Sequence, residues 1–205
     1  MSFLTQIIFE HIIIHWGLCF VLTMFDLVTG PKYKIRKLFI PDSWCNIFFC
    51  VVINQVFITF PCLYLFGNFS NEPFLSWQNL YKLPLTLLYE EIFFYTTHKI
   101  LHSQYLYKKI HKIHHRWTSP AALSATYAHP FEHFFSNVAP IILAARFAGL
   151  GKEAARFWHA FALFNTILFS HGGYVSNLHD KHHTDFNCNF GVLGLLDYIF
   201  GTLRM

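Results

Sequence analysis

A run of 24 consecutive residues without a charged side chain, positions 44–67, constrains the fold of this chain more than any other feature. A helix needs about 20 mostly apolar residues to cross the roughly 30 Å hydrocarbon core of a membrane, so the run predicts a spanning helix. Residues 4–28 are also apolar, but Glu10 interrupts them and no cation precedes them, so they predict a retained span or anchor and not a cleaved signal. With 54% hydrophobic and only 13% charged residues, the chain is expected to be an integral membrane protein.

Three further apolar segments follow, at 80–97, 134–148 and 154–170. The first predicts a third helix. The other two are short for full spans and are separated by Gly149 and Gly151, so they predict a tight hairpin that enters the bilayer. The glycines match a dinucleotide-binding fingerprint in letters only, because no strand precedes them. The predicted fold is therefore all-α, with about four transmembrane or hairpin helices and a histidine-rich cytosolic cap.

Basic residues predict the orientation of these helices, because positively charged loops stay on the cytosolic side. Two spans separate the two basic segments, so both segments can face the cytosol. The loop 68–79 between those spans is then lumenal, and it holds a glycosylation sequon at Asn68. The basic residues are Lys32, Lys34, Arg36 and Lys37 in the first segment, and Lys99, Lys108, Lys109, Lys112 and Arg116 in the second.

Eleven of the 14 histidines lie in two polar blocks, 98–133 and 171–183. Eight of them form three motifs, HxxxH at 98–102 and HxxHH at 111–115 and 179–183, and His171 offers a ninth imidazole. On a helix the positions i, i+3 and i+4 share one face. Imidazole is the commonest metal-ligating side chain. Because one ion takes about four to six ligands, nine clustered imidazoles predict two ions. The predicted ligands are His98, His102, His111, His114, His115, His171, His179, His182 and His183.

The remaining polar candidates have weaker signals. His11 and His15 in the first span, and His159 in the hairpin, favour packing or hydrogen bonds between helices. His129 precedes Pro130, which suits the first turn of a helix, so we expect His129 at a helix start near the metals, as a ligand or as a donor to one. His133 is a weaker ligand candidate. Glu91 lies two helical turns before His98, where a carboxylate could hold a ligating imidazole in one tautomer.

The histidine motifs HKILH, HKIHH and HDKHH, with YAHPFEH and FNCNFGVLGLLDYIFGT around them, resemble the fatty acid hydroxylase/sterol desaturase superfamily over residues 85–205, and most closely its methylsterol monooxygenase branch. The resemblance implies an endoplasmic-reticulum enzyme with two irons that uses O2 and electrons from NAD(P)H relayed by cytochrome b5. It implies a lipid or sterol substrate and the same nine histidine ligands. It also implies a division into membrane anchor spans, 1–79, and a di-iron domain, 80–205, within one structural unit.

Two departures from that family pattern concern the second histidine block. Relatives often carry another histidine four residues after the one that matches His171, where this chain has Val175, and the segment between His171 and His179 is shorter than usual. Both departures bear on the completeness of one metal site.

Several functions fit this pattern. The leading hypothesis is a lipid monooxygenase that acts on a sterol or a fatty acyl chain, because hydroxylation of an unactivated C–H bond needs a redox metal, which zinc is not. A desaturase could use the same metal site, and a catalytically weak regulator that binds metal or sterol would tolerate Val175. A metal transporter fits less well, since the histidines cluster at one membrane face. The second basic segment could bind an acidic electron donor. No nucleic-acid partner is expected, and the sequence sets no oligomeric state.

Overall fold

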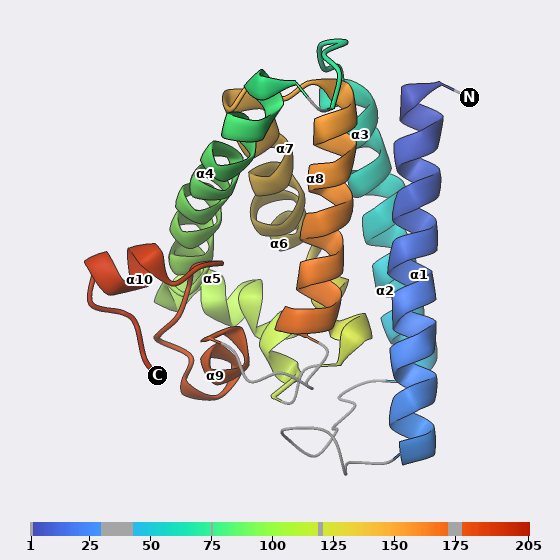
Figure 1. The fold of residues 1–205 in the computed structure, drawn as a ribbon. Coiled ribbons are helices and arrows are strands. Elements are labelled where there is room, and N and C mark those ends of the chain that lie inside the picture. Colours follow the sequence, from blue (N-terminus) through green and yellow to red (C-terminus); the bar gives the residue numbers. More distant parts are fainter. Residues whose placement is uncertain (1, 30–42, 75, 119–120, 172–177) are drawn as a thin grey trace.

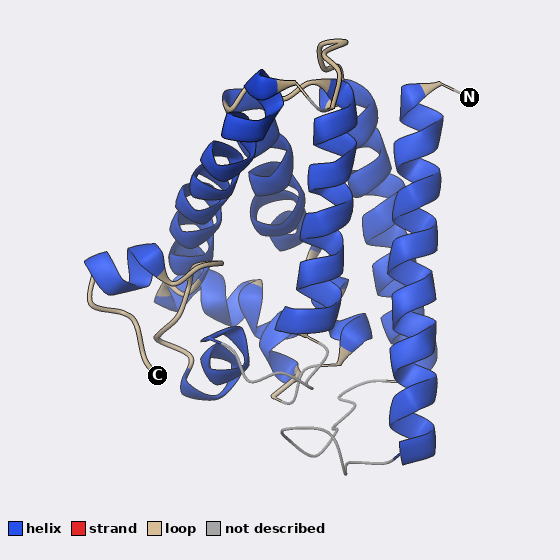
Figure 2. Cartoon of the chain, viewed as in Figure 1, coloured by secondary structure: helices blue, strands red, loops and turns tan. Residues whose placement is uncertain are grey.

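The computed structural model describes residues 2–29, 43–74, 76–118, 121–171 and 178–205. Two of the sequence predictions concern residues outside these ranges, namely the first basic segment, 32–37, and Val175. Within the described residues the regular structure is helical, and the only bridge between extended residues is an isolated one from Ser70 to Gly151. Figure 2 shows the same all-helical arrangement, as the sequence predicts.

Among the described residues, two helices are long and apolar enough to cross a membrane. The first, α1, runs over Phe3–Thr29. The second consists of α2 (Trp44–Asn54), a π-helical turn (Gln55–Thr59) and α3 (Phe60–Phe66), which follow one another without a break. The Ser43 side chain caps its start by accepting a hydrogen bond from Asn46 N at 3.3 Å. These helices agree with the predicted apolar runs 4–28 and 44–67.

The third predicted helix and the predicted hairpin are also present. α4 spans Trp77–Leu101. The hairpin begins with α6 (Pro130–Glu132), continues through a π-helical turn (His133–Val138) into α7 (Ala139–Phe147), and returns as α8 (Lys152–Phe164), which ends in a third π-helical turn (Asn165–Ser170). Gly149 has φ of 68° in the connecting turn, a conformation that favours glycine. In Figure 1 these helices stand side by side with α1 to α3 in one bundle.

Small residues let the two arms of the hairpin approach each other. Ala144 and Ala154 are fully buried, and Ala145 and Ala155 are 3% exposed. Ala145, Ala154 and Ala155 form one apolar core with Trp158 and with side chains of α4. Close backbone contact at small residues is the usual way in which helices associate within a membrane, where burial of apolar area adds little. The outward side chains of α1, such as Phe20 and Val28, are instead apolar and exposed.

Short helices gather at one end of the bundle, where α4 and the α8 arm finish (Figure 1). They are α5 (Gln104–Lys109), a 3-10 helix (His111–Arg116), a second 3-10 helix (Ala122–Thr126), α9 (Leu178–Asp185) and α10 (Leu195–Ile199). Most of the histidines lie on these elements or at the adjoining ends of the long helices.

Candidate metal centre

The structure brings all nine predicted ligand histidines together in two adjacent groups. Within each group, the ring nitrogens that could bind an ion lie within 4.8 Å of one another. We call them the five-histidine group (His98, His102, His111, His115 and His182) and the four-histidine group (His114, His171, His179 and His183). Each HxxHH motif contributes to both groups, so the two groups share the same supporting helices.

In the five-histidine group the Nε2 atoms point toward one another. His115 Nε2 lies 3.0 Å from His111 Nε2 and 3.1 Å from His182 Nε2. His102 Nε2 lies 3.2 Å from the Nε2 atoms of both His115 and His182. The His98 ring completes the group, with its centroid 4.4 Å from that of His182.

The four-histidine group has the same arrangement. His179 Nε2 lies 3.1 Å from His171 Nε2 and 3.1 Å from His183 Nε2. His114 Nε2 is 3.5 Å from His171 Nε2. His114 comes from the first 3-10 helix, His171 from the end of the α8 arm, and His179 and His183 from α9, so four imidazoles converge from three elements.

Backbone carbonyls hold the outward-facing nitrogens of four of these rings. His98 Nδ1 is 2.8 Å from Phe190 O, His182 Nδ1 is 2.6 Å from Cys188 O, and His171 Nδ1 is 2.9 Å from Thr166 O. His114 Nδ1 is 3.3 Å from Tyr127 O. Because a carbonyl oxygen only accepts, each Nδ1 must donate, which leaves the lone pair of each neutral ring on Nε2. Converging lone pairs suit a cation between them, so the residues fit a bound metal.

Burial favours the protonation state that binds metal. Burial lowers the pKa of His114 to about 4. Burial, together with the neighbouring His102, lowers the pKa of His182 to about 3. Both imidazoles are therefore neutral at physiological pH, the form in which histidine ligates an ion.

Glu132 is the carboxylate that contacts a histidine of the centre, and the sequence analysis missed it. Its Oε1 atom lies 2.8 Å from His111 Nδ1, and the two side chains are 3% and 1% exposed. A carboxylate bonded to the outer nitrogen of a ligating imidazole fixes the ring and raises its basicity. The YAHPFEH motif carries this residue, but its sequence gives no signal that the glutamate contacts His111, which lies 21 residues earlier.

The structure differs from the prediction for Glu91. Its carboxylate accepts hydrogen bonds from three backbone N–H groups, at 2.7 Å from Val192 N, 2.7 Å from Leu193 N and 2.9 Å from Leu196 N. The carboxylate of Glu91 therefore faces backbone donors and not an imidazole. Glu91 thus acts on the centre indirectly, by holding the segment that carries Phe190.

Two more polar side chains of the C-terminal segment form hydrogen bonds with backbone groups near Phe190. Asp197 accepts hydrogen bonds from Phe190 N and Gly191 N, both at 2.8 Å. Asn189 Nδ2 donates to Leu178 O at 3.1 Å and to Arg204 O at 2.9 Å. These bonds tie the start of α9 to the chain end. They hold in place the carbonyls that orient His98 and His182.

The other candidate histidines lie outside both groups. His129 Nδ1 accepts a hydrogen bond from Phe131 N at 3.1 Å and caps α6, so the predicted helix start is confirmed, but the bond joins His129 to its own helix and not to the metal groups. His133 Nε2 lies 2.8 Å from Thr59 Oγ1. The predicted hydrogen bonds between helices are confirmed, since His11 Nδ1 lies 3.1 Å from His159 Nε2 and His15 Nε2 lies 2.8 Å from Thr126 Oγ1.

A cavity of about 220 Å³ adjoins the two groups and extends into the helix bundle. His98, His111, His114, His171 and His179 line it at the metal end. Apolar side chains from three arms of the bundle form much of its wall, among them Phe94, Ile142 and Leu163. A lipid chain inside this cavity would therefore lie next to both groups.

The fold and the site define a helical membrane protein with histidine clusters that could bind two metal ions. A family model for fatty acid hydroxylases matches residues 83–202. The chain belongs to this fatty acid hydroxylase family, as the resemblance of its motifs implies.

The chain is similar to several curated relatives. It is 38% identical over 174 residues to human fatty acid hydroxylase domain-containing protein 2, covering 76% of this chain and 50% of that relative. It is 40% identical over 126 residues to fatty acid hydroxylase ahd1 of Mycosarcoma maydis, covering 57% and 32%. It is 30% identical over 209 residues to methylsterol monooxygenase erg25B of Aspergillus fumigatus, covering 88% and 70%. The chain thus spans about half the length of the first of these relatives. No solved structure matches it.

Proposed function

We propose that the chain is a membrane-bound di-iron monooxygenase that oxidises a C–H bond of a lipid, either a sterol or a fatty acyl chain. The observation that supports this most strongly is the pair of histidine groups, with Nε2 atoms 3.0–3.5 Å apart, beside a cavity with apolar walls. The family membership and the methylsterol monooxygenase among the relatives point to the same class of reaction.

Two irons fit the donor set. Five and four imidazoles are each enough for one ion, and imidazole suits iron as well as zinc, copper and nickel. Bound iron supplies the redox chemistry that activates O2, which zinc does not have. The proposed ligands are the nine histidines of the two groups. Glu132 orients His111 at the centre, and backbone carbonyls orient four of the other rings.

The remaining residues of the site bind the lipid and shield it from water. Phe94 on α4, Ile142 on α7 and Leu163 on α8 contact the cavity from three sides. An apolar chain held among them presents its C–H bonds toward the histidine end. Positioning of this kind contributes a large share of the rate enhancement in many enzymes.

We also propose an external electron donor, such as cytochrome b5 reduced by an NAD(P)H-dependent reductase. Four basic side chains are exposed on the short helices at the histidine end. Lys112 and Arg116 lie on the 3-10 helix that also carries His111, His114 and His115, and Lys108 and Lys109 lie at the end of the preceding α5. A basic surface there attracts an acidic partner and brings it close to the metals. We place residues 1–79 as the membrane anchor, and 80–205 as the di-iron domain, in the endoplasmic reticulum.

Cysteine labelling tests the orientation. We expect a single cysteine at position 112 to react with a membrane-impermeant maleimide from the cytosolic side of sealed microsomes, since basic segments stay cytosolic. A single cysteine at position 72 should react only after the vesicles are opened. Both single-cysteine variants are made in a protein whose five native cysteines are replaced by serine. Labelling of position 112 from the lumenal side alone would contradict the cytosolic placement of the metal groups.

Isotope-labelled oxygen tests the reaction. Purified protein in nanodiscs, loaded with iron and supplied with NADPH, reductase and cytochrome b5, is expected to introduce one oxygen-18 atom from labelled O2 into a lipid of a membrane extract. Mass spectrometry detects the product. Loss of two hydrogens without oxygen gain would show a desaturase instead, and no change in any lipid would contradict the monooxygenase.

A further inference from the structure

Five buried polar side chains form a layer across the middle of the helix bundle, separate from the two metal groups. Each is between 2% and 8% exposed, and each lines the cavity. We call this set the polar layer; it consists of His11 of α1, Thr59 of the second span, His133 and Ser136 of the α7 arm, and His159 of α8. Polar side chains inside a membrane are costly and usually mark a binding site.

The layer retains free donors and acceptors. A hydrogen bond joins His11 Nδ1 to His159 Nε2 at 3.1 Å. His11 Nε2, His159 Nδ1 and Ser136 Oγ find no hydrogen-bond partner among the described residues. In a neutral imidazole pair one of the bonded nitrogens donates and the other accepts, so one of the two free nitrogens is a donor and the other an acceptor. A hydroxyl group can satisfy either, because it donates and accepts.

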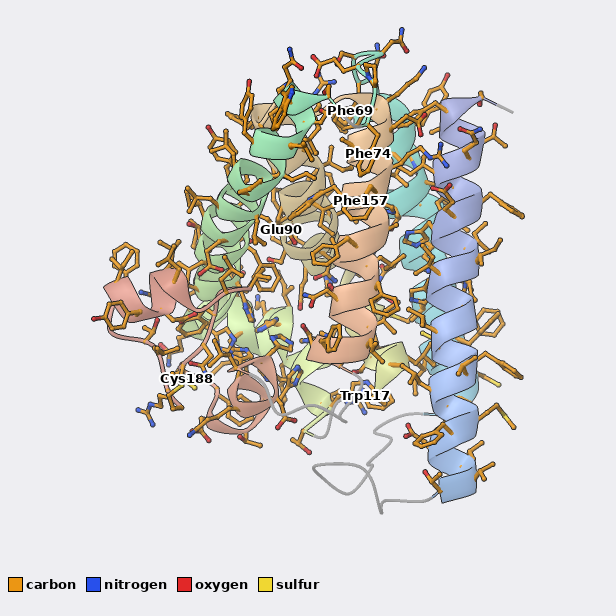
Figure 3. All side chains as sticks on the ribbon, in the orientation of Figure 1. Phe69, Phe74, Glu90, Trp117, Phe157 and Cys188 are labelled. Carbon is orange, nitrogen blue, oxygen red and sulfur yellow. The ribbon has the colours of Figure 1, made fainter. Side chains whose placement is uncertain are left out.

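The charge of the cavity wall excludes anionic head groups. Glu90 and Glu132 line the cavity, whereas no lysine or arginine does so among the described residues. Figure 3 shows Glu90 on α4 well above the gathered ring nitrogens at the lower end of the bundle. A carboxylate or phosphate buried at the polar layer would lack a lysine or arginine partner among the described lining residues, which is strongly unfavourable. An uncharged polar group avoids this cost.

The cavity connects the layer to the metal end. His171 follows His159 by 12 residues along the α8 arm, which corresponds to roughly 18 Å of helix axis. Each of the three π-helical turns contributes lining residues, for example Thr59, Ser136 and Asn165. Because a π turn inserts an extra residue and redirects side chains, such turns are frequent at functional sites. Their presence in three of the helices around one cavity supports a built binding site.

We infer that the polar layer binds the hydroxyl group of an uncharged lipid alcohol, which is the substrate of the metal centre. The hydroxyl is held by the His11–His159 pair and Ser136, and the apolar part of the molecule extends to the histidine groups. The oxidised carbon is therefore remote from the hydroxyl. That the bound alcohol is the substrate rests on the proposed function, whereas the binding site itself follows from the cavity.

Equilibrium binding without reductant tests the site. Protein in phosphatidylcholine nanodiscs is titrated with tritiated hexadecan-1-ol and, separately, with tritiated palmitate, which has the same chain length but an anionic head. We expect the alcohol to bind at least about tenfold more tightly. Ser136→Ala and His159→Leu should each weaken alcohol binding by about fivefold to tenfold, the loss expected for one hydrogen bond, with little effect on palmitate.

Two matched variants control for loss of polar groups elsewhere. Thr96→Ala removes an exposed hydroxyl that donates to Ile92 O in its own helix, and His15→Leu removes a buried imidazole that does not line the cavity. Both should bind hexadecan-1-ol as the wild type does. Equal or tighter binding of palmitate, or unchanged alcohol binding by Ser136→Ala, would overturn the inference. His182→Ala should keep alcohol binding while it loses turnover, so a failure of the proposed function and a failure of this site are distinguishable.

Discussion

His182→Ala is expected to abolish lipid oxidation and to weaken the binding of one of two iron ions. The His182 ring is fully buried, its Nδ1 atom bonds Cys188 O at 2.6 Å, and its Nε2 atom faces His102 and His115. Loss of this ring leaves four imidazoles in its group. We expect turnover to fall by more than about 100-fold, because loss of an outer partner alone costs 10–100-fold in metal affinity or activity. Elemental analysis and oxidation assays measure the two effects.

His183→Ala and His15→Ala show whether the effect of His182→Ala is specific to the five-histidine group. His183 belongs to the four-histidine group, so its loss should weaken iron binding at the other position, and Mössbauer spectra of the two variants should differ. His15 is an equally buried imidazole that bonds Thr126 Oγ1 at 2.8 Å, away from both groups, and its replacement should leave two irons and most of the activity. Full lipid oxidation by His182→Ala would show that the reaction does not need this histidine as a metal ligand, whereas absence of oxidation by the wild type would leave the regulator as the function of this chain.

Much of the fold follows from local sequence pattern. The uncharged run at 44–67 predicts a spanning helix, and the glycines at 149 and 151 predict the turn of the hairpin. Both features are predictable because they depend only on residues that are close together in the sequence. The nine histidines come together for a related reason. Positions i, i+3 and i+4 share one face of an α-helix. The His111 motif lies on a 3-10 helix, where i and i+3 are aligned and i+4 is turned by about 120°, and it contributes to both groups.

Contacts between distant residues were not predictable in this way. Glu91 and the N–H groups of Val192, Leu193 and Leu196 are about a hundred positions apart, so the sequence indicated a buried carboxylate but not its partner. The π-helical turns have no sequence signature of their own, and they determine which polar side chains face the cavity. Glu132 was missed because its partner His111 lies 21 residues earlier, across two short helices.

Glu132→Gln is expected to weaken metal binding in the five-histidine group by about 10-fold to 100-fold. The amide oxygen of glutamine can still accept the hydrogen bond from His111 Nδ1, so the ring keeps its orientation. The negative charge, however, is lost, and with it the basicity that the carboxylate gives to the imidazole at only 2.8 Å. Glu132→Asp retains the charge on a shorter side chain and should recover part of the affinity. Competition with a chromophoric chelator measures the affinity of each variant without any turnover.

His129→Ala is the matched control for Glu132→Gln, because His129 lies three residues before Glu132 at the start of the same helix. Its ring nitrogen accepts from Phe131 N at 3.1 Å and caps α6. Loss of a helix cap costs about 1 kcal/mol of stability, so the thermal midpoint should fall slightly while metal affinity stays within about twofold of the wild type. If Glu132 only stabilises the fold, Glu132→Gln should likewise lower the thermal midpoint slightly and leave the metal affinity unchanged. Unchanged metal affinity in that variant would therefore show that Glu132 supports the fold and does not tune the metal centre.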